Sequence, residues 1–431
     1  MGATRLPLTE DPAVNDAKPG ARPRALLRLL ALAAAAALLA GCADLPFGQQ
    51  PTAPPVVLIV TATPAPGAPT AAAPPASPTP VALGATAEPA PEATAEPAPE
   101  ATAEPAAAAP GLLQRVRERG RLVCGTNADL PGFGFYDSVR GRWTGFDVDF
   151  CRALAAAIFA DAGAVEFVAL TTAGPNERFE AVRSGRVDVL FRNTTWTLGR
   201  DLAQLAFGPT TFHDGQTFMV RADAGIAGSA DLEGLRICVS RGTTSEQNLN
   251  DDFAARGIEF EAVLFDDESQ LYPAYDRGEC DAVTSDSSQL ASKLETLEDP
   301  DEHTILGERI SREPLGPAFI EGDEQWRDVV SWAVFATIYA EELRVGQANV
   351  AQLAQGSDDP RVRRLLGAEG DFGASLGLSD DFALQIVSQV GNYGDIYDRN
   401  LGPDTPFALE RGPNKAWNLG QGGVLASPPF R

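Results

Sequence analysis

The chain has 431 residues and a formal net charge of −25, which argues against a nucleic-acid partner because phosphates would be repelled rather than neutralised. Its two histidines give little support to a zinc site or to a histidine-based catalytic group. About 320 residues follow position 110, which is enough for two lobes of ordinary size and an extension.

A basic and apolar leader occupies residues 1–41. Its apolar stretch, 25–40, is too short and too rich in alanine to span a membrane comfortably. The leader ends at Leu39-Ala-Gly-Cys42, which resembles a lipobox. We therefore expect a lipoprotein signal peptide, with Cys42 lipidated and anchoring the exported protein to the cell membrane. The alternative is an ordinary secretory leader with a chance cysteine, which would export the protein as well.

A spacer rich in Pro, Ala, Thr and Glu follows over residues 42–110. The octapeptide Ala85–Glu92 recurs at 93–100, and the tract has almost no aromatic or branched apolar residues. Such a segment cannot offset the entropy that is lost on ordering, so we expect it to be disordered. Its prolines favour extended polyproline II structure, at roughly 3 Å per residue.

Residues 111–431 alternate between predicted strands and helices in two similar blocks. The predicted strands are Arg121–Gly125, Val165–Leu170 and Val187–Phe191 in the first block, and Leu235–Val239, Glu261–Phe265 and Asp281–Thr284 in the second. The predicted helices are Gly145–Ile158, Glu177–Ser184, Ser245–Ala255, Gln270–Asp276 and Ser288–Leu297. This alternation predicts an α/β fold with mostly parallel sheets flanked by helices. Two such halves place a ligand site in the cleft between them.

The segments after the second block lead back to the first and then into an extension. We assign 111–220 to the first part of lobe 1, 221–315 to lobe 2, 316–345 to the return into lobe 1, and 346–431 to a C-terminal extension. Within the return, Trp326–Leu343 is a predicted amphipathic helix. The extension is rich in Gly, Asp and Pro, and its predicted helical stretches lie near 362–366 and 382–390.

Four of the five cysteines lie in the folded part, and an even number in an exported chain suggests two disulfides. Three pairings are possible. We favour Cys124–Cys151 with Cys238–Cys280, because each bond would then stay inside one lobe. A disulfide that closes a loop of this size stabilises a fold by roughly 3–4 kcal/mol. Four buried free thiols are the alternative, whereas the spacing does not favour a metal site.

Several segments resemble one family of proteins. They are Gly145-Phe-Asp-Val-Asp-Phe150, Arg192-Asn-Thr-Thr-Trp-Thr-Leu-Gly-Arg-Asp201, Gly242-Thr-Thr-Ser-Glu246, Glu313-Pro-Leu-Gly-Pro-Ala318 and Val390-Gly-Asn-Tyr-Gly394. The chain resembles the extracellular solute-binding proteins of polar amino acid ABC importers, in their general L-amino acid-binding branch, over nearly all of 111–431. The resemblance implies a type II periplasmic-binding-protein-like fold, with two lobes joined by two crossing segments.

For function, the resemblance implies capture of L-amino acids and their delivery to an ABC permease, with broad specificity and no cofactor. We expect an extracytoplasmic monomer, in the periplasm or on the cell surface. An enzyme on the same scaffold, such as a dehydratase or a peptidoglycan lyase, is the alternative. Against it, His213 and His303 form no recognisable base–nucleophile arrangement. A sensor lobe is a third possibility.

The resemblance also implies which residues hold the α-carboxylate of the ligand. Arg200 suits this group, since its planar fork matches two oxygens. Asn193 and Thr195 keep the family's spacing to Arg200, although Asn193 replaces the usual glycine. The alternative for Arg200 is a surface ion pair with Asp201 or a nearby acid. In lobe 2 we expect Thr244 to donate to the carboxylate from a helix N-terminus.

Asp286 follows a predicted strand and lies where the family places the acceptor for the α-ammonium group. Capping of the helix that begins at Ser287 or Ser288 is its alternative role. A ligand held by Arg200 and Asp286 would bridge the two lobes and favour the closed state. In the pocket for the ligand's side chain, the resemblance places Asp129 where many relatives have an aromatic residue that stacks on the ligand. Trp196 is expected either to line this pocket or to pack in the core.

Overall fold

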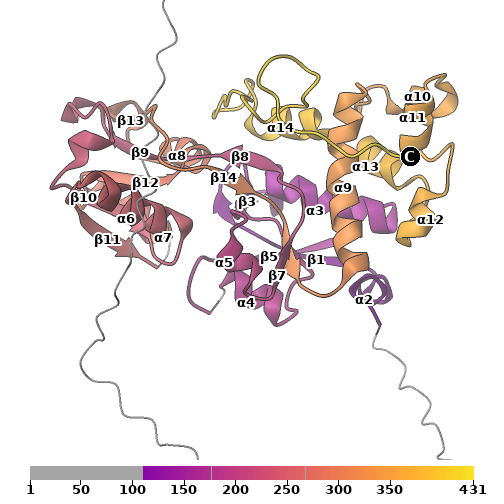
Figure 1. The fold of residues 1–431 in the computed structure, drawn as a ribbon, viewed down its shortest axis with the longest axis horizontal. Helices are drawn as coiled ribbons and strands as arrows, with labels where there is room; N and C mark the ends of the chain where they lie inside the picture. The colour runs from indigo at the N-terminus through magenta and orange to yellow at the C-terminus, as the bar shows by residue number, and fades with distance from the viewer. Residues whose placement is uncertain (1–109, 176, 267) are drawn as a thin grey trace, which may run out of the picture. The chain divides into compact units, whose positions relative to one another are not determined.

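A computed structural model describes residues 110–431, except 176 and 267 (Figure 1). The predicted leader, the spacer and Cys42 lie outside the described residues. Within the described part of the chain, no helix is both long and apolar enough to cross a membrane.

The first lobe is built on a five-stranded sheet with the order β5-β1-β6-β15-β7. Its strands are β1 (Leu122–Thr126), β5 (Val165–Ala169), β6 (Val189–Leu190), β7 (Leu205–Phe207) and β15 (Ala318–Ile320). Its helices are α2 (Leu112–Arg119), α3 (Phe146–Phe159), α4 (Arg178–Arg183) and α5 (Leu198–Asp201). A small sheet of β2 (Asp129–Leu130), β3 (Gly134–Asp137) and β4 (Arg142–Thr144) follows β1.

The second lobe repeats this plan with the order β11-β10-β12-β9-β13. Its strands are β9 (Gln216–Arg221), β10 (Arg236–Ser240), β11 (Glu261–Phe265), β12 (Ala282–Asp286) and β13 (His303–Ile305). Its helices are α6 (Thr244–Arg256), α7 (Glu268–Asp276) and α8 (Ser287–Leu294), with 3₁₀ turns η1 (Ala222–Ala224), η2 (Ser229–Leu232) and η3 (Pro300–Glu302). In both sheets three neighbouring strands are parallel and the fourth is antiparallel, as β15 is to β6 and β9 is to β12.

Two short strands connect the lobes. β8 (Phe212–Asp214) leads from lobe 1 into β9, and β14 (Glu313–Leu315) leads back from lobe 2 towards β15. They pair antiparallel, with Glu313 opposite Asp214, and Figure 1 shows them between the two sheets. The predicted fold class is therefore confirmed: two α/β lobes are joined by two crossing segments.

The C-terminal extension covers helix α3. After α9 (Glu324–Glu342), the chain forms α10 (Val350–Gly356), α11 (Pro360–Leu365), α12 (Phe372–Leu376), α13 (Phe382–Gln389) and α14 (Tyr393–Leu401). The sequence predicts a single apolar stripe on α3, but the helix is buried on nearly every side because α9, α13 and α14 pack against it. Asp149 in its first turn is buried too, and it accepts hydrogen bonds from Arg399 and Asn400 of α14, both at 2.7 Å.

Two disulfides hold helices and loops to the two sheets. Cys124 of β1 is bonded to Cys151 of α3, and Cys238 of β10 is bonded to Cys280 in the turn before β12. Each bond lies inside one lobe, so the favoured pairing is confirmed.

Candidate ligand-binding site

A small cavity lies between the lobes, with a free volume of about 30 Å³. From lobe 1 it is lined by Thr172, Arg178, Asn193, Thr195 and Arg200, and from lobe 2 by Ser240, Thr243, Thr244, Ser245, Glu268, Leu271, Tyr272, Thr284, Ser285, Asp286 and Gln289. A volume of this size holds little more than a water molecule. A ligand larger than a few atoms can therefore enter only when the lobes move apart.

A larger cavity of about 1080 Å³ lies between the crossing strands, lobe 2 and the extension. Its size would favour the larger cavity as the ligand site, but the polar groups that line the two cavities favour the smaller one. Among the described residues, buried side-chain atoms without a hydrogen-bond partner include Arg178 Nε, Asn193 Oδ1 and Asp286 Oδ1 at the small cavity, and none at the large one. Buried polar atoms without partners are rare and call for a ligand or another explanation.

Arg200 is held at the cavity by contacts within lobe 1. Its backbone N–H donates to Thr197 Oγ1, which caps the short helix α5, and its Nη1 donates to Thr195 O at 2.7 Å. The guanidinium lies over the Phe179 ring, 5.1 Å from its centroid. Burial lowers the pKa of Arg200, while Asp286 and Glu313 act in the opposite direction. The ion pair with Asp201 is not formed.

Asp286 ends strand β12 and faces the cavity from lobe 2. The residue is 6% exposed, and its Oδ1 has no hydrogen-bond partner. It stands at the N-cap of α8, but its side chain makes no capping bond, so the alternative role is not observed. Burial raises the pKa of Asp286 well above its usual range, and Asp214 and Glu313 raise it further. A cationic group beside this carboxyl would relieve the penalty.

Helix α6 presents its N-terminus at the cavity, as predicted. Thr243 Oγ1 accepts the N–H of Glu246 at 3.1 Å, and Glu246 Oε2 accepts the N–H of Gly242 at 2.6 Å. Thr244 is the first residue of the helix, and its Oγ1 lies 3.5 Å from Thr195 Oγ1 in lobe 1. Thr195 also donates to Glu313 Oε2 at 2.6 Å.

Asn193 takes a backbone conformation that would suit a glycine, the residue that the resemblance implies at this position. Its φ is +20°, outside the region that most side chains adopt, and asparagine tolerates positive φ better than other residues do. Its N–H donates to Asp147 Oδ2 at 2.9 Å, and its Nδ2 donates to Gln289 Oε1 of lobe 2 at 2.7 Å. Its Oδ1 is left without a partner.

Asp129 and Trp196 do not line the cavity. The loop after β1 folds into the small sheet of lobe 1, which turns Asp129 towards α8, where its carboxylate accepts from Lys293 Nζ at 2.8 Å. Asp129 therefore joins the two lobes at the edge of the cleft. Trp196 is 44% exposed, stacks on Phe207 and donates to Asp201 Oδ1, so it neither lines the small cavity nor packs in the core.

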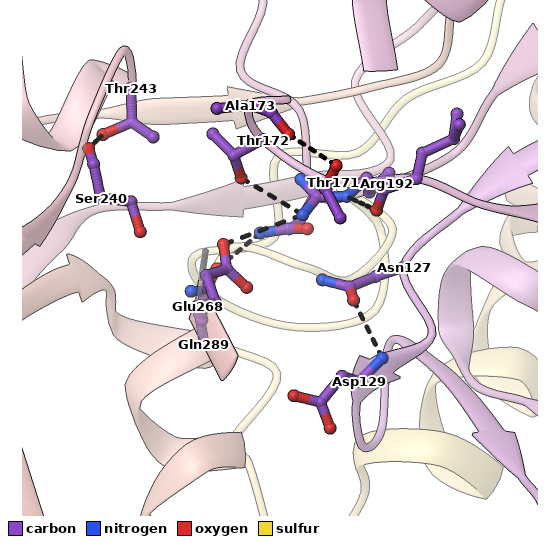
Figure 2. A network of polar contacts seen from close by, with 12 residues as sticks. Asn127, Asp129, Thr171, Thr172, Ala173, Arg192, Ser240, Thr243, Glu268 and Gln289 are labelled. Atoms are coloured by element: carbon purple, nitrogen blue, oxygen red, sulfur yellow. Dashed lines mark hydrogen bonds and ion pairs between the residues drawn. The ribbon is translucent and has the colours of Figure 1, made fainter. Parts of the chain in front are cut away.

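Sequence reasoning missed three charged residues beside the cavity, namely Arg178, Arg192 and Glu268. Both arginines are buried, at 4% and 3% exposure. Figure 2 shows the contacts of Arg192 Nη2 with Thr172 Oγ1 at 3.4 Å and with Glu268 Oε1 at 3.8 Å. For Arg192 the signal was present, because it directly follows the apolar run Val189–Phe191, where a charge is buried unless the chain turns out to solvent.

The two-lobed fold and its cleft define the class of periplasmic-type binding proteins, and comparisons with known proteins agree. Residues 122–344 match the family of bacterial extracellular solute-binding proteins, family 3. The chain is 45% identical over 328 residues to the general L-amino acid-binding periplasmic protein AapJ of Rhizobium johnstonii, covering 75% of this chain and 94% of that protein. It is 42% identical to the glutamate/glutamine/aspartate/asparagine-binding protein BztA of Rhodobacter capsulatus, covering 75% and 95%.

A solved structure supports the same assignment. An ABC transporter periplasmic binding protein from Brucella ovis with glutathione bound is 44% identical, has a TM-score of 0.72 and covers 75% of this chain and 100% of that one. The chain therefore belongs to family 3 of the bacterial extracellular solute-binding proteins. The resemblance to amino-acid-binding members, which the sequence motifs indicated, is confirmed.

Proposed function

We propose that this protein captures L-amino acids in the cleft between its lobes and delivers them to an ABC permease in the cytoplasmic membrane. The observation that carries the proposal is the pair of buried opposite charges, Arg200 in lobe 1 and Asp286 in lobe 2, at one cavity. A zwitterion leaves water only if both of its charges find partners. The relatives are named as amino-acid-binding proteins, which supports this ligand class.

The proposed roles follow from the donors and acceptors at the cavity. Arg200 binds the α-carboxylate with its guanidinium fork, and Thr195 and Thr244 donate hydroxyl or backbone hydrogen bonds to the same group. Asp286 accepts from the α-ammonium group through its unpartnered Oδ1, with Asn193 Oδ1 as a second acceptor. These groups are common to all amino acids, so we expect a broad range of ligands.

Ligand binding and lobe closure are coupled in this proposal. Contacts already join the lobes at the cleft: Asn193 with Gln289, Thr195 with Thr244, and Asp129 with Lys293. A ligand held from both sides adds contacts that exist only when the lobes are together, so it shifts the population to the closed state. Glu313 of the returning strand β14 accepts from Thr195 and from Asn248, which ties the crossing segment to both lobes.

Isothermal titration calorimetry of the purified protein with a panel of L-amino acids tests the proposal. We expect one ligand per chain, micromolar or tighter affinity, and recovery of the ligand unchanged. Small-angle scattering should report a smaller radius of gyration with ligand. Release of a reaction product would favour the enzyme alternative, and no binding by any amino acid would refute the proposal.

We also propose that the protein acts as a monomer, anchored outside the cytoplasmic membrane through lipidated Cys42 at the end of a long spacer. The anchoring rests on the sequence of residues 1–110 alone. Globomycin should block processing of the leader, and Cys42→Ser should move the protein from the membrane fraction to the soluble extracytoplasmic fraction. A Cys42→Ser protein that stayed membrane-bound would contradict lipid anchoring.

A further inference from the structure

The C-terminal extension grips the first of the two crossing strands. Asn414 is buried, at 3% exposure, and its side chain binds both backbone polar groups of His213 in β8. Asn414 Oδ1 accepts the N–H of His213 at 2.6 Å, and Asn414 Nδ2 donates to His213 O at 3.0 Å. Tyr393 of α14 donates to Thr211 O, just before the strand, at 2.8 Å. The extension therefore holds the start of β8, much as a neighbouring strand would.

The loop that carries Asn414 is itself fixed to lobe 1. The N–H of Asn414 donates to Arg411 O at 2.7 Å, and Arg411 Nε donates to Asn414 O at 2.8 Å. Arg411 Nη2 also donates to the buried Glu341 of α9 at 3.0 Å, and its guanidinium carbon lies 5.2 Å from the centroid of Tyr397. Because α9 packs on α3 in lobe 1, His213 is bound to that lobe through the extension.

The next residue of the crossing strand is bound to lobe 2. The carboxylate of Asp214 accepts the hydroxyl of Ser287 at 2.5 Å and the N–H of Ser288 at 3.1 Å, so it caps helix α8. At Gly215 an added Cβ would lie 2.8 Å from Ser311 O, so a glycine is needed where the crossing segments approach each other. Attachment therefore changes from lobe 1 to lobe 2 between His213 and Asp214.

The returning segment changes lobes at the same level. The N–H of Ile310 donates to Gln216 O of lobe 2 at 3.0 Å, whereas Pro314 O accepts the N–H of Trp196 of lobe 1 at 2.9 Å. Pro314 stands opposite His213 in the register of β8 and β14. Both crossing segments therefore pass from one lobe to the other at one level, which is the geometry of a hinge.

The larger cavity separates the extension from lobe 2 beside this hinge. It is lined by Asn414 and Val424 of the extension and by Ser287 and Arg309 on the side of lobe 2. Asp286 lines the small cavity, and Ser287, the next residue, lines the large one. The two cavities thus lie on different sides of the point where lobe 2 joins the crossing strands.

We propose that the C-terminal extension is a hinge clamp. Asn414 keeps the start of β8 in lobe 1, so the chain bends at the His213–Asp214 junction, and the loop that carries Asn414 limits how far the lobes open. Rotation that widens the small cavity brings lobe 2 towards this loop across the large one. A limited opening leaves the ligand-free protein fewer open states, so less of the ligand's binding free energy is lost in closing the cleft.

Distances between the lobes test the clamp in the ligand-free protein. Spin labels at Glu180→Cys on α4 and Asp251→Cys on α6, both exposed positions, report the opening by double electron–electron resonance. With Cys42→Ser in the same chain, the labelled cysteines are the only ones outside the two disulfides. Asn414→Ala should extend the distribution to longer distances than the unmodified chain reaches, because it releases β8 from the loop.

The matched control is Asn418→Ala in the same loop. Asn418 Nδ2 donates to Glu342 O of α9 at 2.9 Å, so this side chain ties the loop to lobe 1 without touching β8. Its replacement should leave the distances unchanged. Equal distributions for Asn414→Ala and the unmodified chain would overturn the inference, and so would an equal widening by Asn418→Ala.

Hydrogen exchange of the unmodified chain tests the clamp even if Asn414→Ala does not fold. Without ligand, the amide of His213 should exchange at least about 1000-fold more slowly than in an unstructured peptide, because its bond to Asn414 holds in the open state as well. Protection below about tenfold would overturn the inference, since the bond would then break when the lobes open. Both measurements use the ligand-free protein, so they decide the inference even if the proposed amino-acid ligands fail to bind.

Discussion

Replacing Asp286 by asparagine should weaken the ligand complex and strengthen the empty protein. The carboxylate is buried with an unpartnered Oδ1, and Asp214 and Glu313 raise its pKa in addition to burial. A carboxyl group whose pKa is raised in the folded state destabilises the fold at pH values above its unfolded pKa, by about 1.4 kcal/mol for each pKa unit. The neutral carboxamide keeps the shape and removes the charge, so the ligand-free protein should gain about 1–2 kcal/mol at pH 7.5. For a domain of this size that raises the Tm by about 2–5 °C.

Ligand binding should change in the opposite direction. Removing one partner of a buried charge pair weakens a complex by about 2–5 kcal/mol, which corresponds to roughly 30-fold to several thousandfold in Kd. Calorimetry should therefore show weak or undetectable binding of every amino acid by Asp286→Asn. Thermal unfolding should show a higher Tm without ligand and little further rise with it.

The matched control is Asp281→Asn, just before the same strand. Asp281 is paired with Arg236 at 2.8 Å, and this pairing lowers its pKa, so its replacement should slightly destabilise the protein and leave binding unchanged. The reasoning would be refuted if Asp286→Asn lowered the stability of the ligand-free protein and bound amino acids normally. Asp286 would then support the fold rather than the ligand.

Three further changes test other parts of the account. Arg200→Ala should abolish binding of all amino acids alike, since the α-carboxylate is common to them, and calorimetry showing loss of only some ligands would contradict its role. Burial raises the pKa of Asp147 in the folded state to about 7. The folded state therefore binds the proton of this carboxyl more tightly than the unfolded state does, and the free energy of unfolding falls as pH rises from about 4 to about 7. In urea titrations Asp147→Asn should therefore be more stable than the original chain at pH 8, by up to about 4 kcal/mol, and no more stable at pH 4. Replacing Cys238 and Cys280 by alanine opens a loop of 42 residues and should lower the free energy of unfolding by about 4 kcal/mol; an unchanged urea midpoint would contradict this estimate.

Local patterns predicted the elements that carry the site. Helix α3 and strand β11 were placed within one residue of their observed bounds, because apolar residues in a regular pattern are a strong local signal. Arg200 was chosen through the family resemblance and its spacing to Asn193 and Thr195, and it lies in helix α5. Asp286 was chosen because it follows a predicted strand at the place of the family's acceptor, and it is the last residue of β12. The burial of Asp286 agrees with that choice.

Features that depend on distant parts of the chain were not predictable in the same way. Helix α3 is covered by the extension, more than two hundred residues away along the chain. Its amphipathic pattern therefore predicted the face that packs on the sheet, but not the burial of the opposite face. Asp129 turns towards Lys293 of lobe 2, a partner that no spacing rule identifies. Arg178 carries no comparable signal in the sequence, and only the folded chain brings it and Arg192 close to one another beside the cavity.

A crystal structure grown with L-aspartate tests the central claim most directly. The account predicts that the ligand lies between the lobes, with its α-carboxylate on the Arg200 guanidinium and its ammonium group within hydrogen-bond distance of Asp286 Oδ1. A ligand bound in the larger cavity beside the crossing strands, or one in the cleft that touches neither Arg200 nor Asp286, would contradict it.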